Sequence, residues 1–475
     1  MKNKKQVKKS FIVINILLLV FTILFFISLF YLIGKSQIRI NIITGIICLI
    51  SAILVFFLIM FFKSFNKTPK INKQKADLDE FLKSDKIDIV DEKIIYALTN
   101  HDNISNSELK EPEQEDEASR FYMLTKIDKK MESYVPPKYD DDISLEEFCI
   151  EFRKFSAGKL HLYYDIEDIR RFVASLAVTK LIILQGMSGT GKTSLAYAFG
   201  EFVDNEAVVI PIQPMWKERT DLIGYYNEFT KKFNETTMLC TLYEANLNND
   251  LYALVLDEMN IARIEYYFAE FLSLLELPNP EGRNLDVVSD KWENDPKLLK
   301  NGKLRLPVNM WFIGTANNDD STFAISDKVY DRAMVMNLDK KAKPFEVEGY
   351  KKERISINHL NDLIDKAQEE YSLTERNLRR IKQLDEYMIK TFHLTFGNRI
   401  MKQIYSYVPV MVACGGKEIE AIDDILARKV FRKLEAKNPV YVRQQAEGLI
   451  NYINDLFGNN NLKQCVEVIT TLEQN

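Results

Sequence analysis

A phosphate-binding pattern is the part of this sequence most clearly suited to chemistry. Residues 186–193 fit G-x-x-x-x-G-K-[ST], with an apolar run before them and a helical pattern after them. In such a loop the glycines let backbone N–H groups surround phosphates, Lys192 reaches the β- and γ-phosphates, and the Thr193 hydroxyl binds Mg²⁺. The flanking patterns favour a nucleotide site over a chance glycine-rich turn. The residues predicted to bind the nucleotide here are Gly186, Ser188, Gly189, Thr190, Gly191, Lys192, Thr193 and Ser194.

Two adjacent acids, Asp257 and Glu258, end the apolar run "LYALVLDE". At the end of a strand beside the phosphate-binding strand, Asp257 would hold Mg²⁺ and Glu258 would polarise the attacking water. Acidic residues also favour helix N-termini for electrostatic reasons, so the pair alone would not indicate catalysis. The phosphate-binding pattern earlier in the chain makes catalysis the favoured interpretation.

A third polar group follows another apolar run. Asn317 ends "NMWFIGTAN", where it could orient water or sense the γ-phosphate, and Asp319 and Asp320 could assist it. Taken alone, "NNDDS" is typical of an ordinary turn. Arg332 lies just beyond and is a candidate arginine finger for the nucleotide of a neighbouring subunit, with a surface salt bridge as the alternative.

These residues need strands and helices to position them. Between residues 143 and 340, the runs "KLIILQ", "AVVIPIQ", "LYALVLDE" and "NMWFIGTAN" alternate with helical patterns, which predicts an α/β domain with a parallel sheet. From 341 to 475 the strand signals fade, and the patterns predict a helical lid and C-terminal helices. One apolar helix face is predicted after the paired acids, at Ile264, Tyr267, Phe268, Phe271, Leu272 and Leu275.

Two long apolar segments, residues 11–33 and 40–62, contain no charged residue. A helix over either one would rise about 35 Å, enough for a hydrocarbon core of about 30 Å. Their length, and the second segment directly after the first, argue against a cleavable signal. Lysines before the first segment and after the second predict that both termini face the cytoplasm. Residues 1–65 are therefore predicted to form a transmembrane hairpin in the bacterial inner membrane, with the catalytic domain in the cytoplasm.

The composition bears on nucleic-acid binding, on disulfide and metal sites, and on the linker. A net charge of −5 gives no overall basic field that would argue for nucleic acid. The five cysteines are scattered singly, which disfavours a disulfide framework or a metal site and favours small buried hydrophobic side chains. Residues 66–142 are lysine-rich, then acidic, then turn-prone, and this order predicts an acidic, partly disordered linker.

Taken together, these motifs resemble those of AAA+ ATPases, and most closely the McrB-type branch, which is related to the dynein-like and MoxR-like AAA+ domains. "LDEMNIARIEYYFAEFLSLLE" is similar to the McrB segment after the second nucleotide motif. "GTANNDD" resembles the McrB signature M-N-x-x-D, with Asn317 and Asp320 at its fixed positions and Ala316 in place of its methionine. "PIQPMWKERTDLIGYYN" matches the family at Trp216, Asp221, Leu222, Gly224 and Tyr225.

The resemblance implies a P-loop AAA+ domain with an all-α lid and a homo-hexameric ring with nucleotide sites between subunits. It further implies that Arg332 acts on a neighbour's nucleotide, and that Arg399 in "FGNRI" is a lid arginine that contacts the γ-phosphate. McrB proteins pair with a nuclease, McrC, and restrict modified foreign DNA. They commonly use GTP, whereas most AAA+ relatives use ATP, so ATP is favoured on the wider family and GTP stays open. Mg²⁺ is the expected cofactor.

Three functions are compatible with these features. The first is a membrane-anchored NTPase that moves or remodels DNA in an McrBC-like defence against phage, with an McrC-like nuclease as partner. The second is a membrane-associated MoxR-like chaperone that remodels protein complexes. The third, a nucleotide-gated scaffold with negligible turnover, is disfavoured because Asp257, Glu258 and Asn317 are all present. No nuclease core is visible in the sequence.

Overall fold

The computed structural model describes residues 119–474, apart from 318–321 and 340–341. The predicted membrane hairpin and most of the predicted linker lie outside the described residues. Asp319 and Asp320, predicted to assist Asn317, lie outside them too. Among the helices of the described part, none is long and apolar enough to cross a membrane.

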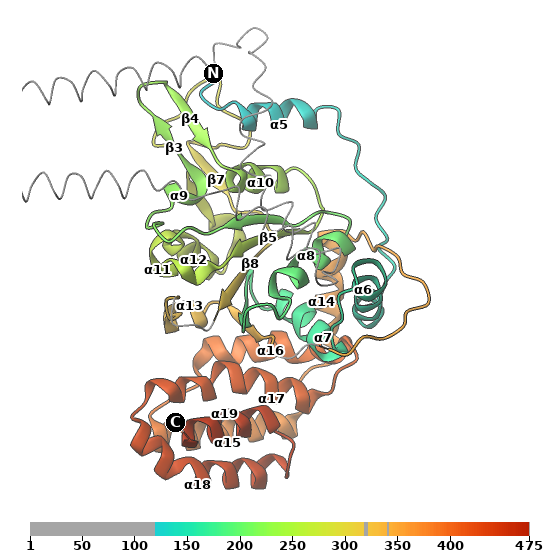
Figure 1. Ribbon diagram of the computed structural model, residues 1–475, viewed down its shortest axis with the longest axis vertical. Coiled ribbons are helices and arrows are strands. Elements are labelled where there is room, and N and C mark those ends of the chain that lie inside the picture. The colour runs from blue at the N-terminus through green and yellow to red at the C-terminus, as the bar shows by residue number, and fades with distance from the viewer. Residues whose placement is uncertain (1–118, 318–321, 340–341, 475) are drawn as a thin grey trace, which may run out of the picture. The chain divides into compact units, whose positions relative to one another are not determined.

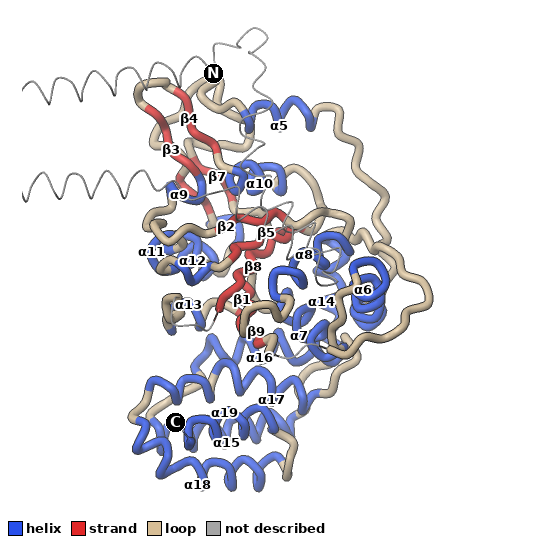
Figure 2. The backbone as a smooth tube through the Cα atoms, viewed as in Figure 1, coloured by secondary structure: helices blue, strands red, loops and turns tan. Residues whose placement is uncertain are grey.

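A five-stranded parallel sheet forms the centre of the nucleotide-binding domain (Figure 1; Figure 2). Its strand order is β2–β5–β8–β1–β9. The four apolar runs that predicted strands are confirmed, and β9 is a fifth strand that was not predicted. The strands are β1 (Leu181–Gly186), β2 (Val208–Pro211), β5 (Tyr252–Asp257), β8 (Met310–Asn317) and β9 (Met334–Asn337). This architecture fits the predicted P-loop AAA+ fold.

The strand order corrects one prediction. The strand that ends in the paired acids, β5, was expected beside the phosphate-binding strand β1, but β8 lies between them and pairs with both. The sequence does not reveal that β8 lies between β1 and β5 in the sheet, because β8 comes after both of them along the chain. As a consequence the end of β8 lies between the phosphate-binding loop and the acids.

Both faces of the sheet are covered by helices, which explains why its strands are apolar without alternation. In β1, for example, Ile182 and Leu184 join one hydrophobic core, and Leu181 and Ile183 join the other. Figure 1 shows the two groups of helices on opposite sides of the sheet. The first group is α6 (Leu145–Leu160), α7 (Ile166–Leu176) and α8 (Lys192–Phe202). The second is α10 (Thr237–Ala245), α11 (Ile264–Tyr267) and α12 (Ala269–Glu276).

The helix predicted after the paired acids is interrupted. The chain leaves helical geometry at Phe268 (φ −106°, ψ 9°), so two short helices, α11 and α12, replace the single predicted helix. Its apolar face is nevertheless confirmed as core, since the side chains from Ile264 to Leu272 on that face are buried, and Leu275 packs against them partly buried. Stacking of Phe268 on Phe271, with ring centroids 4.8 Å apart, joins the two helices.

The C-terminal region is helical throughout its regular elements, as predicted. Figure 1 shows α15, α17, α18 and α19 gathered together beyond α16, which packs against α7. The helices are α14 (Ile357–Glu370), α15 (Glu375–Phe392), α16 (Gly397–Ala413), α17 (Glu418–Lys429), α18 (Pro439–Phe457) and α19 (Lys463–Gln474). Shorter elements join the main sheet to its helices: α9 (Thr220–Ile223), α13 (Asp327–Tyr330), the hairpin β3 (Gly224–Asn227)–β4 (Lys232–Glu235) and the hairpin β6 (Asn284–Asp286)–β7 (Lys303–Arg305).

The start of the described chain falls within the predicted linker. Residues 119–131, which include α5 (Met123–Met131), pack against the α/β domain through the buried Phe121 and Leu124. Arg120 is buried and donates to the carboxylate of Asp295 at 2.9 Å. Asp295 lies far from Arg120 along the chain, so local composition could not predict this contact.

Candidate active site

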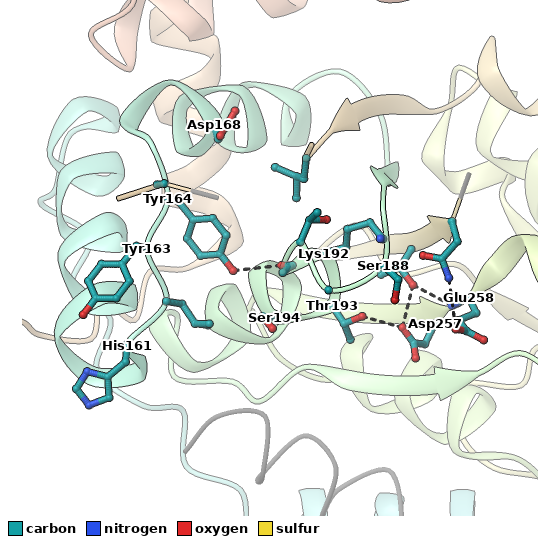
Figure 3. Close-up of a pocket in the computed structure, with 18 residues that line it drawn as sticks. His161, Tyr163, Tyr164, Asp168, Ser188, Lys192, Thr193, Ser194, Asp257 and Glu258 are labelled. Carbon is teal, nitrogen blue, oxygen red and sulfur yellow. Dashed lines mark hydrogen bonds between the residues drawn. The ribbon is translucent and has the colours of Figure 1, made fainter. Parts of the chain in front are cut away.

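The predicted phosphate-binding loop, the paired acids and Asn317 meet at the carboxyl edge of the sheet, where β1, β5 and β8 end (Figure 3). They line a cavity of about 350 Å³, a size typical of small-molecule sites. The predicted residues that line it are Ser188, Gly189, Thr190, Gly191, Lys192, Thr193, Ser194, Asp257, Glu258 and Asn317. The structure therefore brings together side chains that lie far apart in the sequence.

The loop after β1 adopts a conformation that glycine makes accessible. Gly189 and Gly191 have φ values of 75° and 89°, in the left-handed region where a side chain would be strained. Lys192 starts α8, and its ammonium donates to the carbonyls of Gly186 (3.0 Å) and Met187 (2.6 Å). The buried ammonium and the N-terminal end of α8 make the loop electropositive, as phosphate binding requires.

The residues predicted to hold the metal are already in contact. Thr193 donates its hydroxyl to Oδ1 of Asp257 at 2.9 Å. Thr315, on the intervening strand β8, donates to the same carboxylate oxygen at 2.8 Å and accepts from the backbone N–H of Glu258 at 2.8 Å. Hydroxyl and carboxylate oxygens are the ligands that Mg²⁺ prefers, so this donor set fits the ion.

Thr315 is a site residue that the sequence analysis missed. Its signal is weak: one polar residue inside the apolar run "WFIGTAN". β8 lies between β1, which leads into the loop, and β5, which ends in the acids. The Thr315 hydroxyl can therefore bond both the Asp257 carboxylate and the backbone N–H of Glu258. The side chain is buried, with 2% of its surface exposed.

Glu258 has an unusual backbone. Its φ of 51° and ψ of 45° lie in the left-handed region, which is uncommon for a residue with a side chain and often marks a functional position. Asn317 donates its side-chain amide to Oε1 of Glu258 at 3.4 Å. Asn260 supports this arrangement, because its side chain bonds both the N–H (3.3 Å) and the carbonyl (2.9 Å) of Asn317. Glu258 and Asn317, which were predicted separately, are thus hydrogen-bonded to each other.

The other end of the cavity was not predicted. Residues 161–164, between α6 and α7, line it together with Asp168, Leu338 and Ala342. Tyr164 is buried and donates its hydroxyl to the carbonyl of Gly191 at 3.2 Å. Burial raises the pKa of Asp168, and Arg171 beside it opposes the shift. This aromatic wall beside the phosphate loop suits a planar base, and no phosphate motif in the sequence marks it.

The two predicted arginines lie elsewhere. Arg332 and Arg399 are not among the described residues that line the cavity. Both guanidinium groups instead bind Glu276 at the end of α12, one on each carboxylate oxygen. Arg332 also donates to the carbonyl of Lys328 at 2.8 Å. Arg399 therefore lies outside the lining of its own chain's cavity, and the salt-bridge alternative describes the contact that Arg332 makes.

Comparisons with known proteins add little to this geometry. No protein-family model matches the sequence, and neither does any curated protein. Among solved structures, a full-length MCM homologue from Methanopyrus kandleri is similar over 62% of this chain and 61% of that chain, with 12% sequence identity and a TM-score of 0.33. The chain thus spans about three fifths of the length of that homologue.

Proposed function

We propose that the protein is an AAA+ NTPase that hydrolyses a nucleoside triphosphate with the help of Mg²⁺. The observation that carries the proposal is the hydrogen-bonded group at the ends of β5 and β8. There the hydroxyl of Thr193 and the carboxylate of Asp257 lie side by side, next to a carboxylate on Glu258. Two oxygen donors beside a carboxylate, in one cavity with a glycine-rich loop, support the proposed metal site and base.

Each residue then has a defined task. The loop N–H groups and Lys192 bind the phosphates, and Thr193 with Asp257 holds Mg²⁺. When bound, Mg²⁺ would neutralise charge on the phosphate oxygens. Glu258 accepts the proton of the attacking water, and Asn317 holds the Glu258 carboxylate in place and orients the water. Residues 161–164 would hold the base.

The wider proposal is a membrane-anchored, McrB-like motor that works as a homo-hexameric ring on DNA with an McrC-like nuclease partner. Its support is the set of McrB-like motifs quoted above, together with the position of Arg332 outside its own chain's cavity. In a ring, Arg332 would reach the nucleotide held by the next subunit and stabilise charge there during phosphoryl transfer. The two long apolar segments near the N-terminus support the membrane anchor.

A hydrolysis assay on the detergent-purified full-length protein tests the proposal. ATP and GTP are compared, with and without double-stranded DNA and with and without EDTA. We expect Mg²⁺-dependent turnover of at least one nucleotide, stimulation by DNA, and loss of nucleotide binding in Lys192→Ala. Turnover that ignores DNA would exclude the DNA motor and favour the chaperone alternative. An absence of turnover with both nucleotides would contradict the NTPase itself.

A further inference from the structure

A short basic segment of the C-terminal helical region binds the stretch of chain that carries Arg332. The segment is residues 428–433, "RKVFRK", at the end of α17 and the start of the turn after it. All four of its basic side chains contact residues 327–335, which comprise α13, Arg332 and the start of β9. We refer to residues 428–433 as the basic clamp.

Lys429 lies at the centre of the basic clamp. Its ammonium donates to the carbonyl of Tyr330 at 2.8 Å and to the carbonyl of Ala333, the residues on either side of the Asp331–Arg332 pair. Lys429 is buried, with 4% of its surface exposed, although it contacts no carboxylate directly within the described residues. A buried amino group is costly unless it is hydrogen-bonded, and here two backbone carbonyls accept from it. Lys429 therefore fixes the backbone on both sides of Arg332.

The neighbouring basic residues hold the rest of the stretch. Arg432 bonds the carboxylate of Asp327 at 2.8 Å, and its guanidinium lies 3.6 Å from the centroid of the Tyr330 ring. Lys433 pairs with Asp331 at 2.9 Å. These contacts secure α13 from its first residue to its last.

Arg428 links the same clamp to the nucleotide cavity. It donates to the carbonyl of Val335 in β9 at 2.9 Å. Leu338, just after β9, lines the cavity and bonds back to β1 through the carbonyl of Gln185. One continuous set of contacts thus runs from the cavity wall, through β9 and the clamp, to Arg332.

We propose that the basic clamp is a positioning device for Arg332, with Lys429 as its key residue. A movement of the C-terminal helices relative to the sheet would then shift Arg332, so the nucleotide state of one cavity would control hydrolysis in the next. The inference rests on the proposed function, in which Arg332 acts on a neighbouring subunit. A merely structural role for Lys429 is the alternative, and it would affect the variant's own cavity instead.

The first test is the steady-state kinetics of Lys429→Met in the full-length protein. We expect kcat to fall at least about 10-fold while KM for the nucleotide changes less than about twofold, the pattern of a lost interaction made in the transition state. Lys417→Met is the matched control, because Lys417 is an exposed lysine at the other end of α17 that pairs only with Glu420 among the contacts of the described chain. A rise in KM with unchanged kcat would overturn the proposal.

The decisive test uses mixed oligomers purified through a different tag on each variant. A Glu258→Gln subunit lacks its own base but keeps Arg332 in place, whereas a Lys429→Met subunit keeps its base but loses the position of Arg332. We expect each variant alone to be strongly impaired and the mixture to recover turnover, because the Glu258→Gln subunit supplies Arg332 to the cavity of its neighbour. Arg332→Ala mixed with Glu258→Gln should recover in the same way.

The outcomes separate this inference from the proposed function. If the Arg332→Ala mixture recovers and the Lys429→Met mixture does not, the positioning role of Lys429 is overturned and the trans-acting arginine stands. If neither mixture recovers, the trans-acting arginine itself is wrong, and the positioning role falls with it. Should Lys429→Met fail to fold, Arg432→Gln, which removes one partly exposed ion pair, carries the same experiment. It should show a smaller loss of kcat and the same recovery, and a loss that mixing does not recover would overturn the proposal.

Discussion

Thr315 shows how much a single hydroxyl can organise in this cavity. It bonds the carboxylate of Asp257 and the backbone N–H of Glu258, so it fixes the metal-binding acid and the candidate base relative to one another. Strand pairing alone could not place Glu258 this way, because Glu258 has already left the strand with a φ of 51°.

We predict that Thr315→Val lowers kcat by about 10-fold or more, because small misplacements of catalytic groups are costly. The loss of buried hydrogen bonds should also lower the free energy of unfolding by about 1–3 kcal/mol. Thr241→Val is the matched control, since Thr241 is a buried threonine whose hydroxyl bonds the carbonyl of Thr237 in α10, away from the cavity. Equal kcat losses in the two variants would contradict a specific role for Thr315.

Lys429 should make stability depend on pH. Burial lowers the pKa of Lys429 from 10.5 to about 7, Asp331 opposes this shift, and Arg432 adds to it. Between these two pKa values the unfolded chain binds a proton that the folded chain does not. The contribution of Lys429 to the free energy of unfolding therefore rises with pH across that window and is least favourable below it.

Urea unfolding of the wild type and of Lys429→Met at about pH 7 and about pH 9 checks this prediction. The difference in free energy of unfolding, wild type minus variant, should increase at the higher pH. A difference that is the same at both pH values would show that Lys429 keeps an ordinary pKa.

At the scale of elements, the packing of residues 119–131 against the α/β domain can be tested by mutation. Arg120 and Asp295 are both buried, with 2% and 3% of their side-chain surfaces exposed. Removal of Arg120 takes the opposite charge away from the buried Asp295 carboxylate, which keeps the backbone N–H of Trp292, and breaking such a buried pair typically costs about 3–5 kcal/mol.

We therefore predict that Arg120→Met lowers the melting temperature clearly, whereas Lys297→Met changes it little. Lys297 pairs with Glu132 at 2.8 Å, and both side chains are 65% exposed, so solvent screens the pair. Thermal melts of the two variants provide the comparison. Similar melting temperatures for both variants would mean that residues 119–131 do not stabilise the domain.

The sequence predicted elements better than their arrangement. Strands β1, β2, β5 and β8 were visible because a sheet covered on both faces demands continuous apolar runs. The position of β8 between β1 and β5 was not visible, since pairing joins segments distant along the chain. The interruption at Phe268 was missed for a related reason: the apolar spacing continues through it unchanged.

Some residues of the candidate site could be predicted from the sequence, and others could not. Residues 186–193, Asp257, Glu258 and Asn317 were predictable because phosphate and metal chemistry demands particular residue types at strand ends. Thr315 and residues 161–164 were not, because their roles depend on strand order and on packing beside the loop. Arg399 was assigned by resemblance alone, and in the structure it binds Glu276 outside the cavity.

At the scale of the whole molecule, the chain carries two separate groups of predicted functional residues. The cavity at the sheet edge contains the loop, Thr193 with Asp257, and Glu258, and the face with α12 and α13 contains Arg332 bound to Glu276. Assembly into a ring would bring Arg332 of one subunit to the nucleotide cavity of the next. Hydrolysis would then depend on subunit concentration, because no arginine is among the described residues that line the chain's own cavity.

We predict that turnover per subunit rises with protein concentration and saturates once rings form. Parallel measurement of mass by light scattering should place the rise at the concentration where oligomers appear. A rate per subunit that is constant from the monomeric to the oligomeric range would contradict the shared site.

The most direct test of the central claim compares nucleotide binding and hydrolysis in the wild type and in Glu258→Gln, in the presence of Mg²⁺. The account predicts that the variant binds the nucleotide with a similar Kd and that its turnover falls by about 100-fold or more, since it lacks the base. Glu281→Gln, an exposed glutamate outside the cavity, should behave as the wild type. Hydrolysis by Glu258→Gln at the wild-type rate would contradict the account.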